Sequence, residues 1–510
     1  MADATIGAGG AWLLRRAART PDRSALLVDG RRVDYGELAG RALALAAHLT
    51  RGGVAAGARV ALWAPNGEAF VVALGATAIL GAAVVPLNTR LRDDEVRHQL
   101  MDSAPAAILA APPFDGRARD LGAAAAVPVV RLEEALWAGS ARTAAVATPT
   151  LAPAADTAPF AVVYTSGTTG RPKGAIVSAA NLWHSAVAQA LTLGAGPDDR
   201  WLACLPLFHV SGLALLTRAW LYGQLVIVHE RFEAGAVSAA IDQERVTAVS
   251  LVPTALADLL DARDGRPLPP SLRLVLLGGG PAPRPLLERS LALGVPVAVT
   301  YGLTETASQA ATLPPAALAA HLGSVGTALL PNDIAIVRPD GSQAPEGEVG
   351  EILVRGPTVT PGYLGQPEAT ARALRDGWLR TGDLGQVDAE GYLFVADRRE
   401  DLIVSGGENV YPAEVESVLV GHPDIADAAV VGVADARWGQ AVAAAVVARG
   451  TAQPTLETVG EHVRRHLADY KVPKHLLIVA SLPRTASGKL RRRAVRDLFP
   501  SGGAGAGEKA

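Results

Sequence analysis

The segment from residue 160 to residue 174 joins a short apolar strand to a loop that is rich in glycine and hydroxyl groups. The loop reads TSGTTGRPK and ends at Lys173, so backbone N–H groups, hydroxyls and one ammonium lie within a few residues of each other, a combination that suits a polyphosphate. It is not a Walker A loop, because Lys173 lies between Pro172 and Gly174 instead of between a glycine and a Ser or Thr. The alternative is a flexible surface loop. The candidate phosphate-binding residues are Thr165, Ser166, Gly167, Thr168, Thr169, Gly170 and Lys173.

Lysine is scarce in this chain: five of the 47 basic residues are lysine and the rest are arginine. Because most basic positions in this chain are arginine, a lysine that is retained indicates a need for a compact ammonium group instead of a planar guanidinium. Lys173 ends the loop described above. Lys489 ends the segment PRTASGK, just before three consecutive arginines, and the alternative there is a basic, solvated tail. These two lysines are therefore singled out for a chemical role.

Two further segments follow short apolar runs. Gly278, Gly279 and Gly280 come after the run 272–277, and a backbone without side chains allows a ligand to approach closely, although a tight turn would also use glycine. Residues 301–306 come after the run 297–300. This position is the carboxyl end of a predicted strand, where open α/β sheets bind ligands. The alternatives are core packing for Tyr301 and a solvated acid at a helix start for Glu305.

Short apolar runs alternate with helical patterns over the first 320 residues, which predicts largely parallel sheets covered by helices. The run 69–87 approaches the length of a membrane span, but it is rich in Ala and Gly, so we interpret it as a buried helix followed by a buried strand. Strand-like runs with Gly, Pro and Asp turns then predict a β-rich subdomain at about 320–397. The predicted organisation is a large N-terminal domain (1–397), a small C-terminal α+β lid domain (398–500) and a disordered tail (501–510).

Composition excludes several classes of protein. The 47 basic and 50 acidic residues give a net charge of −3, so no basic field for nucleic acid is expected. A single cysteine, Cys204, excludes internal disulfides and cysteine-based zinc clusters, which fits a reducing, cytoplasmic setting. The first residues lack the positive region of a secretory signal. We therefore expect a cytoplasmic protein with no membrane span.

Several motifs in order along the chain resemble the adenylate-forming superfamily of acyl- and aryl-CoA ligases, luciferases and adenylation domains. The loop at 164–174 is similar to the phosphate-loop signature of that superfamily. The resemblance covers about residues 10–498 and implies an α/β and α+β fold, with two helix-covered sheets and a β-rich subdomain in the large domain and a mobile C-terminal domain. The other matching segments are Pro206–His209, Tyr301–Thr306, Thr381–Asp383, Asp397–Arg398 with Asp401, Ser405–Asn409 and Pro483–Lys489.

The resemblance implies ATP, Mg²⁺ and coenzyme A as cofactors and assigns roles to the motif residues. In adenylation a carboxylate attacks the α-phosphate of ATP, so two anions must be brought together by positive charge and fixed geometry. Glu305 resembles the magnesium ligand, Thr304 a donor to the α-phosphate, and Tyr301 the residue that stacks on adenine. Asp383, in a predicted Thr-Gly-Asp turn, and Arg398 resemble the residues that bind the ribose. Lys489 resembles the lysine that stabilises the charge of the adenylation step.

In the second step a thiol attacks the acyl-AMP after the C-terminal domain of these enzymes rotates. Gly406 and Gly407 would line a narrow channel for pantetheine. The position of the hinge is commonly Asp or Lys in the family, whereas this chain has Glu400. Rotation is still expected, because a hinge needs only to absorb a change in φ and ψ.

A narrower resemblance is to the o-succinylbenzoate–CoA ligases of menaquinone biosynthesis, whose acid has two carboxylates. It is carried by residues 205–223, 276–288, 301–309 and 397–416. A buried carboxylate needs a cation or several donors. Ser211 and Arg218 lie seven residues apart on a predicted helix after His209, so both are expected on one side of it, and the matching residues of these ligases contact the substrate. The alternative for Arg218 is a side chain that reaches solvent. Ser308 and Gln309 are further candidates for the acyl pocket, and His209 for the wall between the acyl and thiol sites.

We therefore predict an AMP-forming acid–thiol ligase whose partners are a small carboxylic acid and coenzyme A. Three alternatives stay open: a ligase for a fatty, aryl or dicarboxylic acid, a stand-alone module that loads a separate carrier protein, and a non-enzymatic nucleotide-binding protein. The sequence does not decide whether the chain forms a homo-oligomer.

Overall fold

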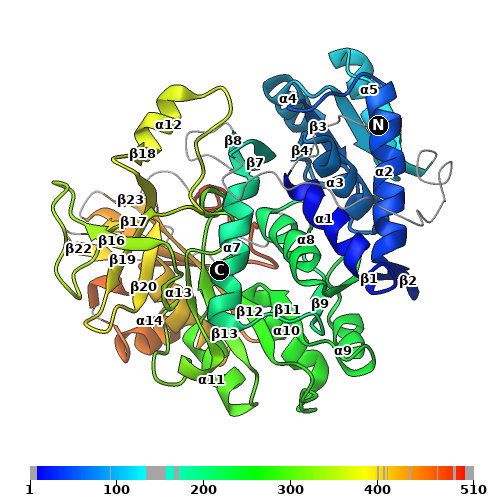
Figure 1. Ribbon diagram of the computed structural model, residues 1–510. Helices are drawn as coiled ribbons and strands as arrows, with labels where there is room; N and C mark the ends of the chain where they lie inside the picture. The colour runs from blue at the N-terminus through cyan, green and yellow to red at the C-terminus, as the bar shows by residue number, and fades with distance from the viewer. Residues whose placement is uncertain are drawn as a thin grey trace.

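The larger part of the molecule is built on two sheets whose central strands are parallel (Figure 1). The computed structural model describes residues 8–91, 93–133, 157–165, 172–398, 401, 403–405, 408–410, 412–435, 438–467, 469–485 and 490–499. The nine-stranded sheet is parallel from β1 to β13 and antiparallel at its two edges. Its order is β15 (Thr327–Ala328), β14 (Ala311–Leu313), β13 (Val297–Tyr301), β12 (Leu274–Leu277), β11 (Ala248–Leu251), β9 (Arg200–Ala203), β10 (Leu225–Val228), β1 (Ser24–Val28) and β2 (Arg31–Asp34).

The second sheet has six strands and carries the predicted phosphate loop at its edge. All its neighbours are parallel except β7 and β8, which form an antiparallel hairpin. Its central strands are buried apolar runs, which suits a sheet covered on both faces. The order is β6 (Val129–Arg131), β5 (Ala107–Ala110), β3 (Arg59–Trp63), β4 (Ala83–Pro86), β7 (Pro159–Thr165) and β8 (Lys173–Ser178).

Helices cover both sheets, and several begin at residues suited to capping. Asp34 accepts a hydrogen bond from the N–H of Glu37 at the start of α2, and Ser178 and Asn181 form a reciprocal capping box at the start of α7. The helices of this part are α1 (Ala8–Arg19), α2 (Tyr35–Arg51), α3 (Glu68–Leu80), α4 (Asp93–Ser103), α5 (Asp115–Ala125), α7 (Ala179–Leu193), α8 (Val210–Tyr222), α9 (Ala234–Gln243), α10 (Pro253–Arg263), α11 (Arg284–Ala292), and the 3₁₀ turns η1 (Thr304–Thr306) and η2 (Pro315–Ala317).

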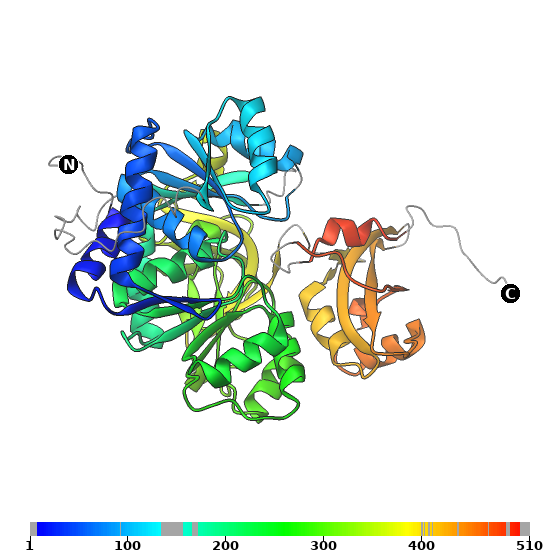
Figure 2. The same cartoon turned by 90° about the vertical axis from the view of Figure 1, so that its right-hand side faces the viewer.

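Two smaller antiparallel sheets follow. One contains β16 (Asp333–Val337), β17 (Gly350–Arg355), β19 (Trp378–Val387), β18 (Leu374–Arg375) and β20 (Leu393–Arg398), with α12 (Pro367–Ala373) beside it. The other contains β22 (Glu408–Val410), β21 (Ile403–Ser405), β24 (Gly439–Ala448), β23 (Ile425–Asp435) and β25 (His475–Ile478), where β25 is parallel to β24. Its helices are α13 (Pro412–Val420), α14 (Leu456–Arg464), η3 (Asp469–Lys471) and α15 (Arg492–Arg496), and Figure 2 shows this C-terminal unit beside the rest of the molecule.

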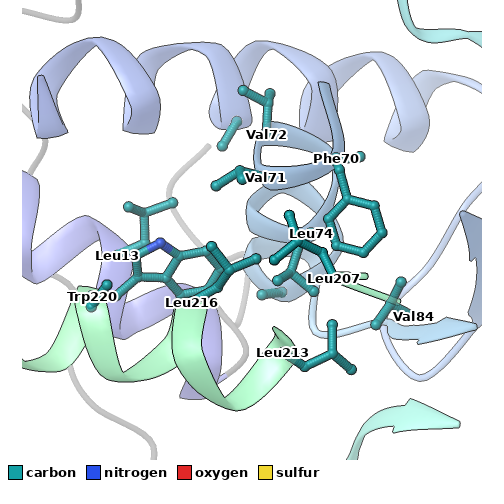
Figure 3. Close-up of a cluster of buried hydrophobic side chains, with 14 of the residues drawn as sticks. Leu13, Phe70, Val71, Val72, Leu74, Val84, Leu207, Leu213, Leu216 and Trp220 are labelled. Carbon is teal, nitrogen blue, oxygen red and sulfur yellow. The ribbon is translucent and has the colours of Figure 1, made fainter. Parts of the chain in front are cut away.

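The core of the large part lies where α1, α3 and α8 meet, and Figure 3 shows its side chains. Leu13 of α1 and Leu74 of α3 are fully buried, and Leu216 of α8 is also 0% exposed. A Cβ on Gly75 would lie 2.9 Å from Cδ2 of Leu13, so the glycine leaves room for this leucine side chain between the two helices. This packing fixes α8, which carries the candidate residues Ser211 and Arg218.

The structure agrees with the fold class predicted from the sequence and corrects some details. The run 69–87 is α3 followed by β4, and no helix among the described residues is long and apolar enough to cross a bilayer. Asp383 lies inside β19, not in the predicted turn, because β19 pairs with β17 on both sides of Gly382, with a register shift there, and pairs with β20 from Asp383 onward. The segment 111–158 contains α5 and β6, and its residues 134–156 lie outside the described part, as does the tail 501–510.

We expect Leu216→Ala to lower the free energy of unfolding by about 2–5 kcal/mol, because it opens a cavity where α8 packs on α1 and α3. Leu191→Ala is the matched control: Leu191 is 70% exposed on α7, so its loss should change the value by less than about 0.5 kcal/mol. Urea denaturation followed by tryptophan fluorescence checks both variants. Equal effects of the two substitutions would contradict the position of the core.

Candidate active site

The turn after β13 brings three of the predicted residues together. A Cβ on Gly302 would overlap the carbonyl oxygen of Ser308 and lie 2.8 Å from the Cα of Gln309, so the two ends of the turn touch. Ala307 and Ser308 have φ values of 51° and 100°, a region that residues other than glycine rarely adopt. The N–H of Ala310 donates to the carbonyl of Tyr301 and closes the turn. Such strained, closed turns cluster at functional sites.

Glu305 occupies the 3₁₀ turn η1, which packs against β8. Its Oε1 accepts a hydrogen bond of 2.9 Å from the hydroxyl of Tyr363, and its carbonyl oxygen accepts one of 2.8 Å from the N–H of Thr360. Burial and the charge of Glu305 raise the pKa of Tyr363, so the hydroxyl keeps its proton and acts as the donor. Thr304 precedes Glu305 in the same turn and is half-buried.

Lys173 contacts the same tyrosine. Its Nζ is 5.4 Å from the centre of the Tyr363 ring, within the range of a cation–π contact. The ring of Tyr363 thus contacts the ammonium of Lys173 while its hydroxyl contacts Glu305. One carboxylate and one cation that share a tyrosine neighbour fit a magnesium ion that takes its other ligands from phosphate and water. No group of three or more His, Cys, Asp or Glu that could hold a metal by itself occurs in the described part of the chain.

The residues on either side of the predicted phosphate loop belong to the hairpin of β7 and β8. Thr165 and Lys173 are register partners at its open end, and Tyr164 anchors the hairpin through a hydrogen bond of 2.6 Å to Oδ2 of Asp102. A Cβ on Gly174 would lie 2.7 Å from Val162, so this glycine lets the strands approach each other. Five of the predicted loop residues lie outside the described residues: Ser166, Gly167, Thr168, Thr169 and Gly170.

Tyr301 meets Asp383 at the carboxyl end of β13. The hydroxyl of Tyr301 donates to Oδ2 of Asp383 at 2.7 Å, and Asp383 is 6% exposed. The pairing of β19 with β20 sets Arg398 directly opposite Asp383, although the side chain of Arg398 is not among those described. An aromatic ring and an acid joined in this way can bind a base and the hydroxyls of its sugar.

The three glycines after β12 differ in their surroundings. A Cβ on Gly278 would lie 2.8 Å from Thr300, so packing between neighbouring strands accounts for this glycine. Gly279 has a φ of 81°, a left-handed conformation that accounts for glycine at this position. A Cβ on Gly280 would meet no atom within 4 Å, which leaves open space beside its backbone.

Arg218 is buried in the middle of α8 with 2% of its surface exposed. Its Nη1 donates to Oε1 of Gln309 at 2.9 Å, its Nε donates to the carbonyl of Ala214, and its guanidinium lies over the ring of Trp201. Among the described residues, no carboxylate forms a hydrogen bond or an ion pair with Arg218. Burial lowers the pKa of Arg218 to about 10, so the group stays charged at neutral pH.

The amide of Gln309 is held on both sides. Its Oε1 accepts from Arg218, and its Nε2 donates to the hydroxyls of Thr312 at 3.1 Å and Thr300 at 3.3 Å. Gln309 is 1% exposed, so in this structure it orients Arg218 and does not face open solvent. Ser308, next to it, is half-buried.

Ser211 and His209 lie at the start of the same helix. His209 is the N-cap residue of α8, and Ser211 is exposed in the first turn, whereas Arg218 is buried two turns later. The loop before the helix is fixed by Asn66, whose amide donates to the carbonyls of Leu205 and His229 and accepts from the N–H of Leu207. Asn66 and Tyr363 are not predicted from the sequence, because neither belongs to a motif with recognisable chemistry.

Four further predicted residues lie outside the described part of the chain: Lys489, Gly406, Gly407 and Glu400. The segments around them are described in part. Leu490 pairs with Arg484 next to the loop of Lys489, and Ser405 and Glu408 are register partners on either side of the two glycines. The roles predicted for these residues therefore stay predictions.

Comparisons with known proteins match both parts of the chain. The family model of the AMP-binding enzymes matches residues 13–364, and that of the AMP-binding enzyme C-terminal domain matches residues 414–489. A protein of Bacillus cereus named 2-succinylbenzoate–CoA ligase is 42% identical, and the match covers 96% of this chain and 98% of that protein. A protein of the same name from Bacillus mycoides has the same identity and coverage.

Solved structures give the same result. The o-succinylbenzoate CoA synthetase of Bacillus subtilis in complex with its acyl-adenylate intermediate has a TM-score of 0.87 and 39% identity over 97% of this chain and 99% of that one. The same synthetase in complex with ATP and magnesium ion has a TM-score of 0.86 and 40% identity over 95% and 99% of the two chains. A fatty acyl CoA synthetase of Mycobacterium tuberculosis has a TM-score of 0.74 and 33% identity over 96% and 98%.

These matches confirm the predicted resemblance and the predicted fold class. The chain belongs to the AMP-binding enzyme family, together with the 2-succinylbenzoate–CoA ligases.

Proposed function

We propose that the protein is an ATP- and Mg²⁺-dependent acid–CoA ligase that converts o-succinylbenzoate to o-succinylbenzoyl-CoA in the cytoplasm. The observation that carries the choice of acid is the buried guanidinium of Arg218, which donates from Nη1 to Gln309 and forms no ion pair with a carboxylate of the described residues. A buried cation is costly unless an anion joins it. The second carboxylate of a diacid supplies that anion, and a guanidinium can bind it through two parallel hydrogen bonds.

In the first half-reaction the acid carboxylate attacks the α-phosphorus of ATP, and pyrophosphate leaves. Lys173 and the loop from Thr165 hold the β- and γ-phosphates, and Thr304 donates to the α-phosphate. Tyr301 stacks on the adenine, while Asp383 and Arg398 hold the ribose hydroxyls. Glu305 is the residue that holds Mg²⁺, which neutralises charge on the phosphates when it is bound.

In the second half-reaction the thiol of coenzyme A attacks the acyl carbon, and AMP leaves. Lys489 acts in the first step and is withdrawn when the C-terminal domain rotates about Glu400. Gly406 and Gly407 then line the path of the pantetheine. His209, at the N-terminus of α8, separates the acyl and thiol sites.

Release of pyrophosphate across a panel of acids tests the proposal. With ATP and Mg²⁺, o-succinylbenzoate should release pyrophosphate faster than benzoate, malonate and octanoate, and coenzyme A should stimulate the release. Preference for another acid would keep the ligase chemistry and discard this substrate. If the acids were activated only when a carrier protein was added, the carrier-loading alternative would replace the proposal. If every acid stayed inactive with the carrier protein as well, the non-enzymatic alternative would replace it.

Lys489→Ala should lower the rate of acyl-AMP formation by about 10²–10³-fold, because it removes a positive group aimed at charge that develops in the transition state. The rate of thioester formation from supplied acyl-AMP should stay within a few fold of the parent. Lys474→Ala, which removes an exposed lysine of the same domain, is the control and should change neither rate. Single-turnover assays of each half-reaction separate these effects, and equal loss in both steps would contradict the assignment.

Arg218→Met should raise the KM for o-succinylbenzoate by about 10- to 100-fold, the loss expected for a hydrogen bond between charged groups. The KM for benzoate should change little, because benzoate has no second carboxylate. Arg263→Met is the matched control, since Arg263 is also buried, with 3% of its surface exposed, but lies on α10 and is paired with Asp242 of α9. The control should lower stability and leave the ratio of the two KM values unchanged. An equal rise in both KM values in Arg218→Met would remove Arg218 from the acid site.

A further inference from the structure

Tyr363 lies in the loop between β17 and α12, and its side chain touches two charged groups of the candidate site. Its hydroxyl donates to Oε1 of Glu305 at 2.9 Å, and its ring lies 5.4 Å from Nζ of Lys173. Both groups come from segments that are far from residue 363 in the sequence. A single side chain therefore connects the carboxylate after β13 with the lysine at the start of β8.

The loop that carries Tyr363 is fixed along its length. The N–H of Ile176 donates to the carbonyl of Gly362 at 3.0 Å, and the N–H of Leu364 donates to that of Gly174 at 2.8 Å, so the backbone on both sides of the tyrosine is bound to β8. The hydroxyl of Thr360 donates to the carbonyl of Ile176 at 2.6 Å. Asn181 of α7 binds the carbonyls of residues 357 and 359. The ring consequently has little freedom to move away from Glu305.

The direction of the hydrogen bond decides which oxygen of Glu305 is engaged. The tyrosine hydroxyl donates to Oε1, which is thereby held as an acceptor, whereas Oε2 accepts no hydrogen bond from the described residues. Groups behind a metal ligand orient the ligand, and their loss commonly weakens metal binding by about 10–100-fold. The ring of the same tyrosine contacts the Lys173 ammonium.

We infer that Tyr363 is a positioning residue that orients Glu305 for magnesium and holds Lys173 beside it, so that the metal and the phosphates of ATP bind together. The inference rests on the proposed role of Glu305 in the adenylation site. It adds a residue from the loop after β17, to which the sequence motifs assign no role.

Titration calorimetry of ATP, with and without Mg²⁺, tests the inference on the full chain. In the parent, Mg²⁺ should tighten the binding of ATP. In Tyr363→Phe, which keeps the ring and removes the hydroxyl, the Mg²⁺ concentration for half-maximal effect should rise about 10–100-fold. Binding of ATP without the metal should change little, since Lys173 keeps its ring. Tyr363→Leu removes the ring as well and should weaken binding of ATP without the metal.

Tyr222→Phe is the matched control, because the hydroxyl of Tyr222 also donates to a protein group, the carbonyl of Ala186, but lies on α8. It should leave the Mg²⁺ dependence unchanged. The melting temperature of Tyr363→Phe should stay close to that of the parent. An unchanged Mg²⁺ dependence, or a variant that fails to fold, would overturn the inference in favour of a packing role. Because calorimetry reads binding without turnover, it decides this question even if no acid is activated and the proposed function fails.

Discussion

The close approach of Gly302 to Ser308 is the constraint on which the rest of the site depends. It folds the turn after β13 back on itself, so that the side chains of Tyr301, Glu305 and Gln309 contact three different parts of the site from one short segment. Tyr301 meets Asp383, Glu305 meets Tyr363, and Gln309 meets Arg218. The positive φ values of residues 307 and 308 show the strain that this geometry requires.

The charge of Arg218 is the second constraint, and it concerns specificity. A guanidinium that is 2% exposed carries a large desolvation cost, and the amide of Gln309 offsets that cost only in part. A methionine would pack in the same place at lower cost, so the arginine does not serve stability. The network from Thr300 and Thr312 through Gln309 holds the group in one orientation, which is what a site for a second carboxylate needs.

Much of this arrangement could be predicted from the sequence where the chemistry is local. The phosphate loop after an apolar strand, the acid at the end of β13 and the arginine in an apolar helix are each visible as patterns in one segment. The contacts between segments could not be predicted in this way. Tyr363 reaches Glu305 only because its loop pairs with β8, and Asp383 was placed in a turn because nothing in Thr-Gly-Asp reveals that β19 continues through the glycine. Ser211 and Arg218 have the predicted spacing, but only the packing of α8 decides that one is exposed and the other buried.

The substitution Gly302→Ala tests the central role of the turn most directly, with the affinities for ATP and for o-succinylbenzoate measured on the same preparation by calorimetry. A Cβ there cannot be accommodated without moving Ser308 and Gln309, so the account predicts that both affinities fall together by at least about tenfold while the chain stays folded. Gly280→Ala, where the Cβ has open space, should leave the affinity for the acid unchanged. Retention of both affinities in Gly302→Ala would contradict the claim that this turn organises the site.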